Sequence, residues 1–178
     1  MLRLIFSAVC VVLAGSSLRA EEQDSGQSSP RPAEVNGIRN VHVSENIMLA
    51  GQPTQEALAE LAKQGFSTVI TLRHEGEERF DEKQTCEKLG LKFVRLPINS
   101  PSEMDDELIR TVCNLLKEAK PDAKVLCHCA GANRVGAVWI PYRVELCDVP
   151  LESAREEAAK VGLKTKELEE QALKYLAQ

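Results

Sequence analysis

Hydrophobic and polar positions along this chain follow two alternating patterns. Short apolar runs of strand length lie at 41–43, 47–50, 67–72, 92–98 and 124–128. Stretches with apolar residues at helical spacing lie at 55–64, 80–89, 105–119, 135–147, 149–161 and 165–176. Three polar residues join the first two runs, which predicts a hairpin. The alternation that follows predicts an α/β fold, a three-layer sandwich whose mainly parallel central sheet is flanked by helices.

Cap and breaker residues define the ends of these elements. Thr54 is a favourable N-cap for the helix at 55–64, and Gly65 is a favourable stop. Pro141 falls inside the helix predicted at 135–147. Because proline removes a backbone donor and clashes with the preceding turn, we expect a kink or a local break after Ile140.

The N-terminal region does not have the pattern of a folded element. Arg3 precedes an apolar stretch, 4–14, that is too short to span a bilayer, and small residues precede a plausible cleavage site after Ala20. We expect a signal peptide over residues 1–20, export to the periplasm or the outside, and no stable membrane span after signal removal; an uncleaved anchor is the alternative. Residues 21–37 are polar with two prolines, which predicts a disordered linker. One domain, 38–178, remains.

Composition excludes some classes of partner. The chain of 178 residues has a net charge of −5 at pH 7, and loss of the leader would remove Arg3 and Arg19 and make it more negative. Nucleic acid is therefore not an expected partner. Five of the six cysteines lie beyond the leader, at 86, 113, 127, 129 and 147. Cys86, Cys113 and Cys147 fall on apolar helical faces, which favours small buried side chains over a disulfide framework.

The stretch 125–139, V-L-C-H-C-A-G-A-N-R-V-G-A-V-W, is the strongest candidate for chemistry. An apolar run ends at His128 and Cys129, a turn of small residues follows, and Arg134 begins a second apolar run. This is the order of a strand, a loop and a helix. Backbone N–H groups and a helix dipole that converge on Cys129 would stabilise its thiolate, so Cys129 is the expected nucleophile.

The same loop has the composition of an oxyanion cradle. Its residues are Ala130, Gly131, Ala132 and Asn133. Their N–H groups would bind a tetrahedral anion, with Gly131 providing the positive φ that a tight cradle needs. Arg134 would add two parallel donors to the same anion.

These residues resemble a known family. The motif His128-Cys129, the short loop and Asn-Arg-Val-Gly at 133–136 are similar to bacterial tyrosine and dual-specificity phosphatase-like proteins related to the phosphatase-like domain of beta-lactamase hydrolase-like proteins. Upstream, A-G-Q-P-T at 50–54 and T-V-I-T-L-R at 68–73, followed by Glu77 and Glu78, are similar to the same family. The resemblance covers roughly 38–168 and implies a cysteine-phosphatase-like fold.

The spacing of the loop leaves the chemistry open. The family signature has five residues between cysteine and arginine, whereas four separate Cys129 from Arg134. A loop of this length also resembles rhodanese sulfurtransferases, in which Cys129 would carry a persulfide. Cys127 is a rival nucleophile, although Cys129 lies nearer the loop. A zinc half-site at Cys127 and Cys129 lacks a second pair of ligands at suitable spacing.

The resemblance also implies an acid that protonates the leaving group. Asn99 stands near the position expected for that acid, so Asp105, Asp106 or Glu103 would have to serve; equally, these acids could simply begin a helix. His128 is expected to hold the turn rather than act as a base. Arg73 or His74 could shape the site, with ordinary solvated charge favoured for His74.

The sequence therefore predicts a cysteine-dependent hydrolase of phosphate monoesters that works through a phosphocysteine. Cys129, Arg134, Asp105 and Asp106 would be catalytic. The substrate-binding residues would be Ala130, Gly131, Ala132, Asn133, His128 and Arg73. We expect no metal, no cofactor, a monomer, and a phosphorylated small molecule or phosphoprotein as partner. The alternatives are a rhodanese-like sulfurtransferase and a catalytically inactive phosphate- or phosphoprotein-binding domain.

Overall fold

The computed structural model describes residues 28–178, so the predicted signal peptide lies outside the described residues. Within them a six-stranded sheet has the order β1-β2-β3-β6-β4-β5. Its strands are β1 (Arg31–Val35), β2 (Ile38–Ser44), β3 (Ile47–Ala50), β4 (Phe66–Thr71), β5 (Lys92–Arg95) and β6 (Lys124–His128). The pairs β3–β6, β6–β4 and β4–β5 are parallel, and β1–β2–β3 is antiparallel. The central sheet is thus mainly parallel, as predicted.

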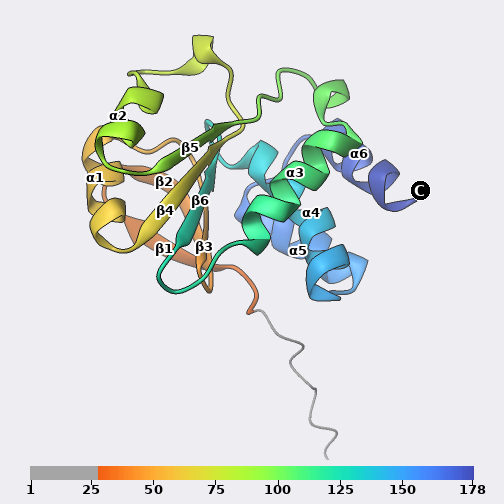
Figure 1. The fold of residues 1–178 in the computed structure, drawn as a ribbon. Coiled ribbons are helices and arrows are strands. Elements are labelled where there is room, and N and C mark those ends of the chain that lie inside the picture. The colour runs from red at the N-terminus through yellow and green to blue at the C-terminus, as the bar shows by residue number, and fades with distance from the viewer. Residues whose placement is uncertain (1–27) are drawn as a thin grey trace, which may run out of the picture.

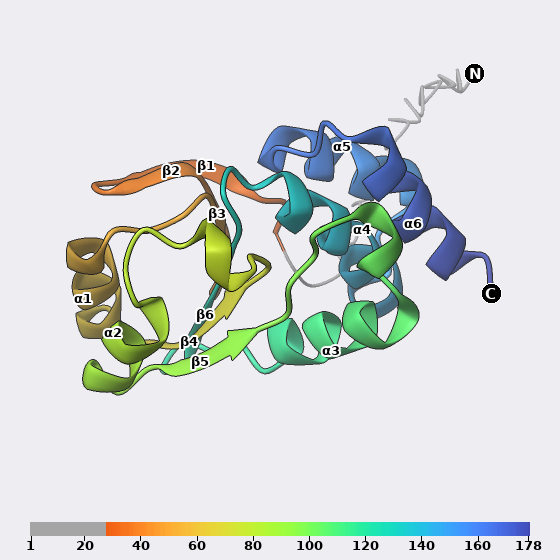
Figure 2. The same cartoon turned by 90° about the horizontal axis from the view of Figure 1, so that it is seen from above.

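Helices cover both faces of the sheet. Helices α1 (Gln55–Lys63) and α2 (Glu82–Lys88) pack on one face, and α3 (Asp106–Lys117), α4 (Asn133–Cys147), α5 (Leu151–Val161) and α6 (Lys166–Leu176) lie on the other. Figure 2 shows the three layers from above, with α1 and α2 opposite the four later helices. Each predicted helix and strand between residues 38 and 178 is present, and Thr54 caps α1 by accepting a hydrogen bond from the N–H of Ala57.

The first strand corrects the predicted linker. Residues 31–35 form β1, which pairs with β2 from Arg31 opposite Val43 to Val35 opposite Ile38 (Figure 1). Nearly all of β1 is exposed, because it is an edge strand with few apolar side chains to bury. That composition gave no strand signal, so the prediction of disorder is wrong for 31–35.

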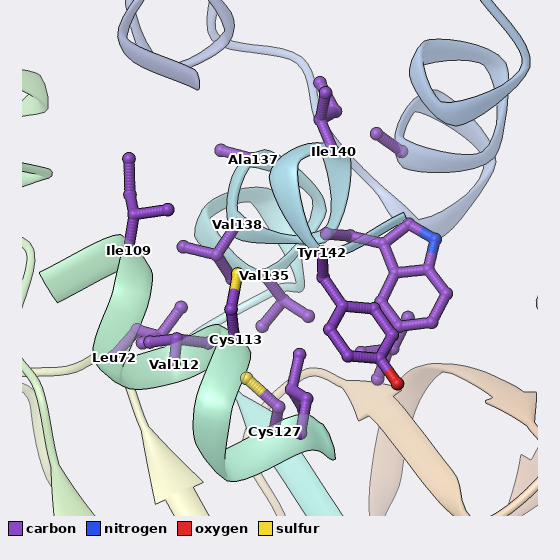
Figure 3. Packing of buried hydrophobic residues seen from close by; sticks show 14 of the residues in the cluster. Leu72, Ile109, Val112, Cys113, Cys127, Val135, Ala137, Val138, Ile140 and Tyr142 are labelled. Atoms are coloured by element: carbon purple, nitrogen blue, oxygen red, sulfur yellow. The ribbon is translucent and has the colours of Figure 1, made fainter. Parts of the chain in front are cut away.

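Helix α4 is the centre of the larger hydrophobic core. It runs without interruption through Pro141, so the predicted local break is absent. Its side chains are buried from Val135 to Arg143, and this packing on all sides offsets the backbone hydrogen bond that proline removes. Figure 3 shows Val135 and Val138 of α4 facing Val112 and Cys113 of α3 across the core.

The five cysteines of the described residues are free and buried, as predicted for Cys86, Cys113 and Cys147. Between residues 28 and 178, the structure contains no helix with both the length and the apolar character required to cross a bilayer.

Candidate active site

The loop between β6 and α4 lies at the carboxyl end of the parallel strands. Strand β6 has a neighbour on each side, β3 and β4, and the chain leaves it at His128. The N–H of Cys129 donates to the carbonyl of Ala50 at 3.3 Å, and the N–H of Leu72 donates to the carbonyl of His128 at 2.9 Å. Both neighbouring strands therefore fix the start of the loop, and Cys129 follows the last residue of β6.

The loop has carbonyl groups that accept hydrogen bonds and N–H groups that are largely available. The carbonyl of Ala130 accepts from the N–H of Gln52 at 3.5 Å, and that of Gly131 accepts from Nδ2 of Asn40 at 3.0 Å. In contrast, the N–H of Ala130 makes no hydrogen bond with any described residue, and those of Gly131 and Ala132 have at most the weak pairing of the isolated bridge between Gly51 and Gly131. Together with the first turn of α4, whose N–H groups have no acceptor within the helix, they are available to bind an anion.

The positive φ of the loop is at Ala132, not at Gly131 as predicted. Ala132 has φ 70° and precedes the first residue of α4, whereas φ of Gly131 is not positive. A left-handed alanine costs roughly 1 to 2 kcal/mol because its Cβ approaches the following carbonyl. Ala132 is fully buried, and its Cβ would lie 3.4 Å from a Cβ placed on Gly162. Tertiary packing therefore holds this strained residue, as is common at functional loops.

Arg134 is held by a carboxylate and two strand ends. Its Nη1 donates to Glu77 Oε1 at 2.7 Å, to the carbonyl of Leu72 at 3.0 Å and to the carbonyl of Ile98 at 3.1 Å, while Nη2 donates to Glu77 Oε2 at 2.6 Å. Nε takes part in none of these bonds. The Nε–Nη2 edge of the guanidinium therefore remains for a second bidentate acceptor, and a phosphoryl group has the matching geometry.

Glu77, named above as part of the family resemblance, is a site residue whose role the sequence did not indicate. It lies in a short 3₁₀ turn, Glu75–Glu77, after β4. The hydrogen bond from Arg134 lowers the pKa of Glu77, so this carboxyl stays ionised and keeps the guanidinium oriented. Arg73 is also near, with its Nε 3.8 Å from Glu77 Oε2, but only 3 % of its side chain is exposed. The side chain of Arg73 is thus buried beneath the site and is not placed to contact a substrate.

The two candidate cysteines occupy different environments. Cys127 points from the sheet into the core beneath α3 and α4 (Figure 3), and burial raises the pKa of its thiol, so it stays protonated. The hydrogen bond to Glu77 and the charge of the nearby Cys129 raise the pKa of Arg134 against the effect of burial. Only 1 % of Cys129 is exposed, so the resting loop covers the thiol. The geometry favours Cys129 over Cys127 as the nucleophile.

His128 faces away from the loop. Its Nε2 lies 2.7 Å from Oε1 of Glu82 on α2, and both side chains have no exposed surface. Neither side chain makes a hydrogen bond that meets the geometric criteria, so the contact is a close polar pair. Because Leu126 and His128 point to the α1 and α2 face of the sheet, the ring of His128 contacts α2 instead of substrate. The expectation of a substrate-binding His128 is not supported, because its ring lies against the side chain of Glu82.

We predict that Glu82→Ala destabilises the protein by about 3 kcal/mol, because it leaves a buried imidazole without its partner. Glu87→Ala, on the exposed side of the same helix, is the matched control and should change stability by less than about 0.5 kcal/mol. Urea unfolding of both variants measures the free energies. Equal stabilities would show that the buried pair contributes nothing.

The structure does not bring Asp105 and Asp106 to the loop. Asp105 caps α3 by accepting from the N–H of Leu108 at 2.9 Å, and Asp106 accepts from Nε2 of Gln178 at 3.0 Å. Both line a separate hollow with Tyr175. These acids begin a helix, which was the other interpretation of the sequence, and their predicted catalytic role is not supported.

Beside Arg134 there is a hollow of about 500 Å³. Its walls come from the loops after β4 and β5, from the start of α4 and from the α5–α6 turn. The lining residues are His74, Glu77, Ile98, Asn99, Ser100, Pro101, Asn133, Arg134, Thr165 and Leu168. Of the predicted loop residues, Asn133 lines it while being tied to the α5–α6 turn: its Oδ1 accepts from the N–H groups of Lys164 and Thr165 at 2.7 and 3.2 Å. No group of three or more metal-binding side chains occurs among residues 28–178.

Comparison with known families decides what kind of protein this is. The family described as DSP-PTPase phosphatase fused to NAD+ kinase matches the chain from residue 18 to residue 174. The chain belongs to this phosphatase family. The match includes the whole of the loop from Cys129 to Arg134 and the Glu77 turn.

Other similar proteins agree with this DSP-PTPase assignment. A beta-lactamase hydrolase-like protein from Agrobacterium fabrum is 27 % identical over 108 residues, which are 58 % of this chain and 24 % of the relative. The chain thus spans about a quarter of the curated relatives it matches. The structure of Tk-PTP in the active form is 26 % identical, with a TM-score of 0.59 over 73 % of this chain and 90 % of that one. TpbA of P. aeruginosa in complex with pTyr, at 18 % identity, has a TM-score of 0.66 over 81 % of this chain and 88 % of that one, which supports the fold alone.

Proposed function

We propose that this phosphatase hydrolyses phosphate monoesters through a phosphocysteine on Cys129. The observation that carries the proposal is the loop itself. Three consecutive N–H groups have at most one weak backbone pairing among them, and the Nε–Nη2 edge of Arg134 makes no hydrogen bond to Glu77, Leu72 or Ile98. Such preorganised donors are worth most where charge develops in the transition state.

The reaction follows from this arrangement. The Nε–Nη2 edge of Arg134 and the loop N–H groups bind the three equatorial phosphoryl oxygens. The Cys129 thiolate attacks phosphorus in line, which forms an S–P bond and breaks the bond to the leaving oxygen. Water then attacks phosphorus, and phosphate leaves with the regeneration of the thiolate. Glu77 keeps Arg134 in place throughout, since its bidentate contact uses the other edge of the guanidinium.

The hollow beside Arg134 indicates the class of leaving group. Ile98, Pro101 and Leu168 give it an apolar wall, while Asn99 and Ser100 are polar. An aryl group with a polar continuation, such as a phosphotyrosine side chain, matches this lining. The complex of TpbA with pTyr supports the same proposal by analogy. A phosphorylated small molecule with an aromatic ring would fit the same wall, and action outside the cytoplasm follows only if the predicted leader is used.

One observation favours a second candidate function, phosphate binding without turnover. Cys129 is 1 % exposed, and the loop that covers it has four residues between cysteine and arginine. Hydrolysis therefore requires the loop to open over the thiol, whereas binding of an anion by Arg134 and the hollow does not.

The test offers p-nitrophenyl phosphate to the purified protein and measures both phosphate release and intact mass after an acid quench. We expect steady phosphate release and a transient mass increase of one phosphoryl group located on Cys129. Tight binding of phosphate without turnover would favour the second candidate. A parallel assay with thiosulfate and cyanide tests the sulfur chemistry, and thiocyanate formation that depends on Cys129 without phosphate release would overturn the proposal.

A further inference from the structure

We propose that a second hollow beside the catalytic loop binds a second phosphoryl group of the substrate. The inference rests on the proposed function and names a class of substrate for it, a compound in which a spacer joins the phosphate that is removed to another phosphate. This hollow has a volume of about 530 Å³. It is lined by two arginines that the proposed reaction does not use, Arg39 and Arg79.

The second hollow lies at the edge of the sheet that holds the catalytic loop. Strand β2 is antiparallel to β3, and β3 is parallel to β6, so β2 begins at the edge where β3 and β6 end. Arg39, at the start of β2, therefore lies at the level of the loop. The other walls come from 52–56, which lead from β3 into α1, and from 79–80, just before α2. Segments that are distant in the sequence thus surround one hollow next to the loop.

The backbone of the hollow is in direct contact with the loop. The N–H of Gln52, a lining residue, donates to the carbonyl of Ala130 at 3.5 Å, and the N–H of Gly51 donates to the carbonyl of Arg39 at 2.8 Å. A Cβ placed on Gly51 would lie 2.9 Å from the carbonyl oxygen of Arg39 and 3.2 Å from that of Ala130. Because residue 51 has no side chain, Arg39 and the loop pack against the same backbone segment. A phosphate bound at the loop therefore has this hollow as its neighbour.

The two arginines of the hollow have no counter-ion. Arg39 and Arg79 are exposed, and neither forms an ion pair or a side-chain hydrogen bond with any residue between 28 and 178. The lining contains one carboxylate, Glu56. Hydrogen bonds from its own backbone N–H and from Thr54 lower the pKa of Glu56, so this carboxylate is ionised and already held at the start of α1. The lining thus has an excess of positive charge in a chain whose net charge is −5.

The acidic residues near Arg79 in the sequence have other partners. Glu75 and Glu78 form ion pairs with Arg95 of β5. Asp81 caps α2, where it accepts a backbone hydrogen bond. An anion that enters the hollow therefore does not have to displace a carboxylate of the protein from Arg79.

The rest of the lining suits a phosphate on an apolar spacer. Nε2 of Gln52 is buried and has no hydrogen-bond partner among the described residues, so this amide can turn toward a ligand without breaking a hydrogen bond. Ile38, Pro53 and Phe80 provide apolar surface for the spacer. A guanidinium group offers parallel donors that match phosphoryl oxygens, and the volume is in the range of small-molecule sites, roughly 300 to 1,000 Å³. A second phosphoryl group therefore fits both the charge and the size of the hollow.

The experiment measures hydrolysis of phenyl phosphates that carry a flexible chain of increasing length. The chain ends either in a phosphonate, which cannot be hydrolysed, or in a neutral hydroxyl group. We expect the phosphonate to raise kcat/KM by about tenfold or more at the chain length that joins the loop to the hollow, and by less at shorter and longer lengths. In the double variant Arg39→Gln with Arg79→Gln this preference should fall below about twofold. Arg31→Gln changes an exposed arginine of β1 that does not line the hollow, and it should keep the preference.

A second arm of the experiment identifies the source of the second phosphate. Peptides that carry phosphotyrosine and a nearby phosphoserine are compared with peptides in which the serine is unmodified. A preference that depends on Arg39 and Arg79 in only one series assigns the substrate to that series. A preference in both series includes small molecules and phosphoproteins.

The proposal is overturned if neither series shows a preference, if the double variant retains it, or if Arg31→Gln loses it equally, which would indicate nonspecific attraction. Calorimetric titration with phenylphosphonates that carry the same two kinds of chain measures binding without turnover. If wild type releases phosphate from none of the substrates, the proposed function fails. Tighter binding of the phosphonate-ended chain that depends on Arg39 and Arg79 would still support the second site, whereas equal binding of the two chains would overturn it.

Discussion

Replacing Cys129 with serine is expected to abolish phosphate release while leaving the fold in place. A serine hydroxyl is a far poorer nucleophile than a thiolate at neutral pH, so kcat should fall by about 10⁴-fold or more. The side chain is nearly isosteric and is followed by a loop held by backbone hydrogen bonds: the N–H of Cys129 donates to the carbonyl of Ala50, and the N–H of Gln52 donates to the carbonyl of Ala130. Release of p-nitrophenol measures the activity, and thermal unfolding measures the fold.

Cys127→Ala is the control for the second thiol of the same strand. It removes a sulfur from the core, where Cys127 has no exposed surface, and should lower stability by about 1 to 2 kcal/mol without abolishing turnover. If both variants are well folded and lose turnover equally, then Cys129 is not the sole nucleophile, and the assignment of the site to a single thiol is wrong.

Arg134→Lys should reduce kcat/KM by about a hundredfold, or about 2.7 kcal/mol. An ammonium group cannot bind Glu77 and a phosphoryl group bidentately at the same time, nor reach the carbonyls of Leu72 and Ile98 with the same fork. The measurement is kcat and KM for p-nitrophenyl phosphate. Arg155→Lys is a suitable control, because Arg155 also contacts two glutamates, Glu152 and Glu169, and does not line the hollow beside Arg134. Unchanged kinetics in Arg134→Lys would remove this residue from the site.

The fold was largely predictable because its elements have strong local signals. Caps such as Thr54 and apolar faces such as that of α3 depend on residues a few positions apart. Strand β1 was missed because its side chains are exposed, and what holds it in place is backbone pairing with β2. An edge strand of this kind has no hydrophobic pattern from which it could be predicted.

The site was predictable only where its residues are close in sequence. Cys129 and Arg134 share one loop, so their spacing gave a clear signal. Glu77 contacts Arg134 although 57 residues separate the two in the sequence. Glu82 contacts His128 from helix α2, which lies on the other face of the sheet from α4. Such pairs are created by the sheet topology, in which β4 lies beside β6. Asp105 was chosen for its charge and position, yet the same features describe an ordinary helix cap.

The C-terminal helices have a structural part in the catalytic loop. Asn133 is tied to the turn before α6 by three hydrogen bonds, and a Cβ placed on Gly136 would lie 2.8 Å from the carbonyl of Ala158 in α5. The first turn of α4 is thus held in place by α5 and by the turn before α6, whose residues follow it by more than twenty positions in the sequence. The loop and strands therefore do not form a minimal unit that could be transplanted or trimmed. Any shortened or chimeric version of this domain must retain α5 and the turn that follows it to keep the geometry of the anion cradle.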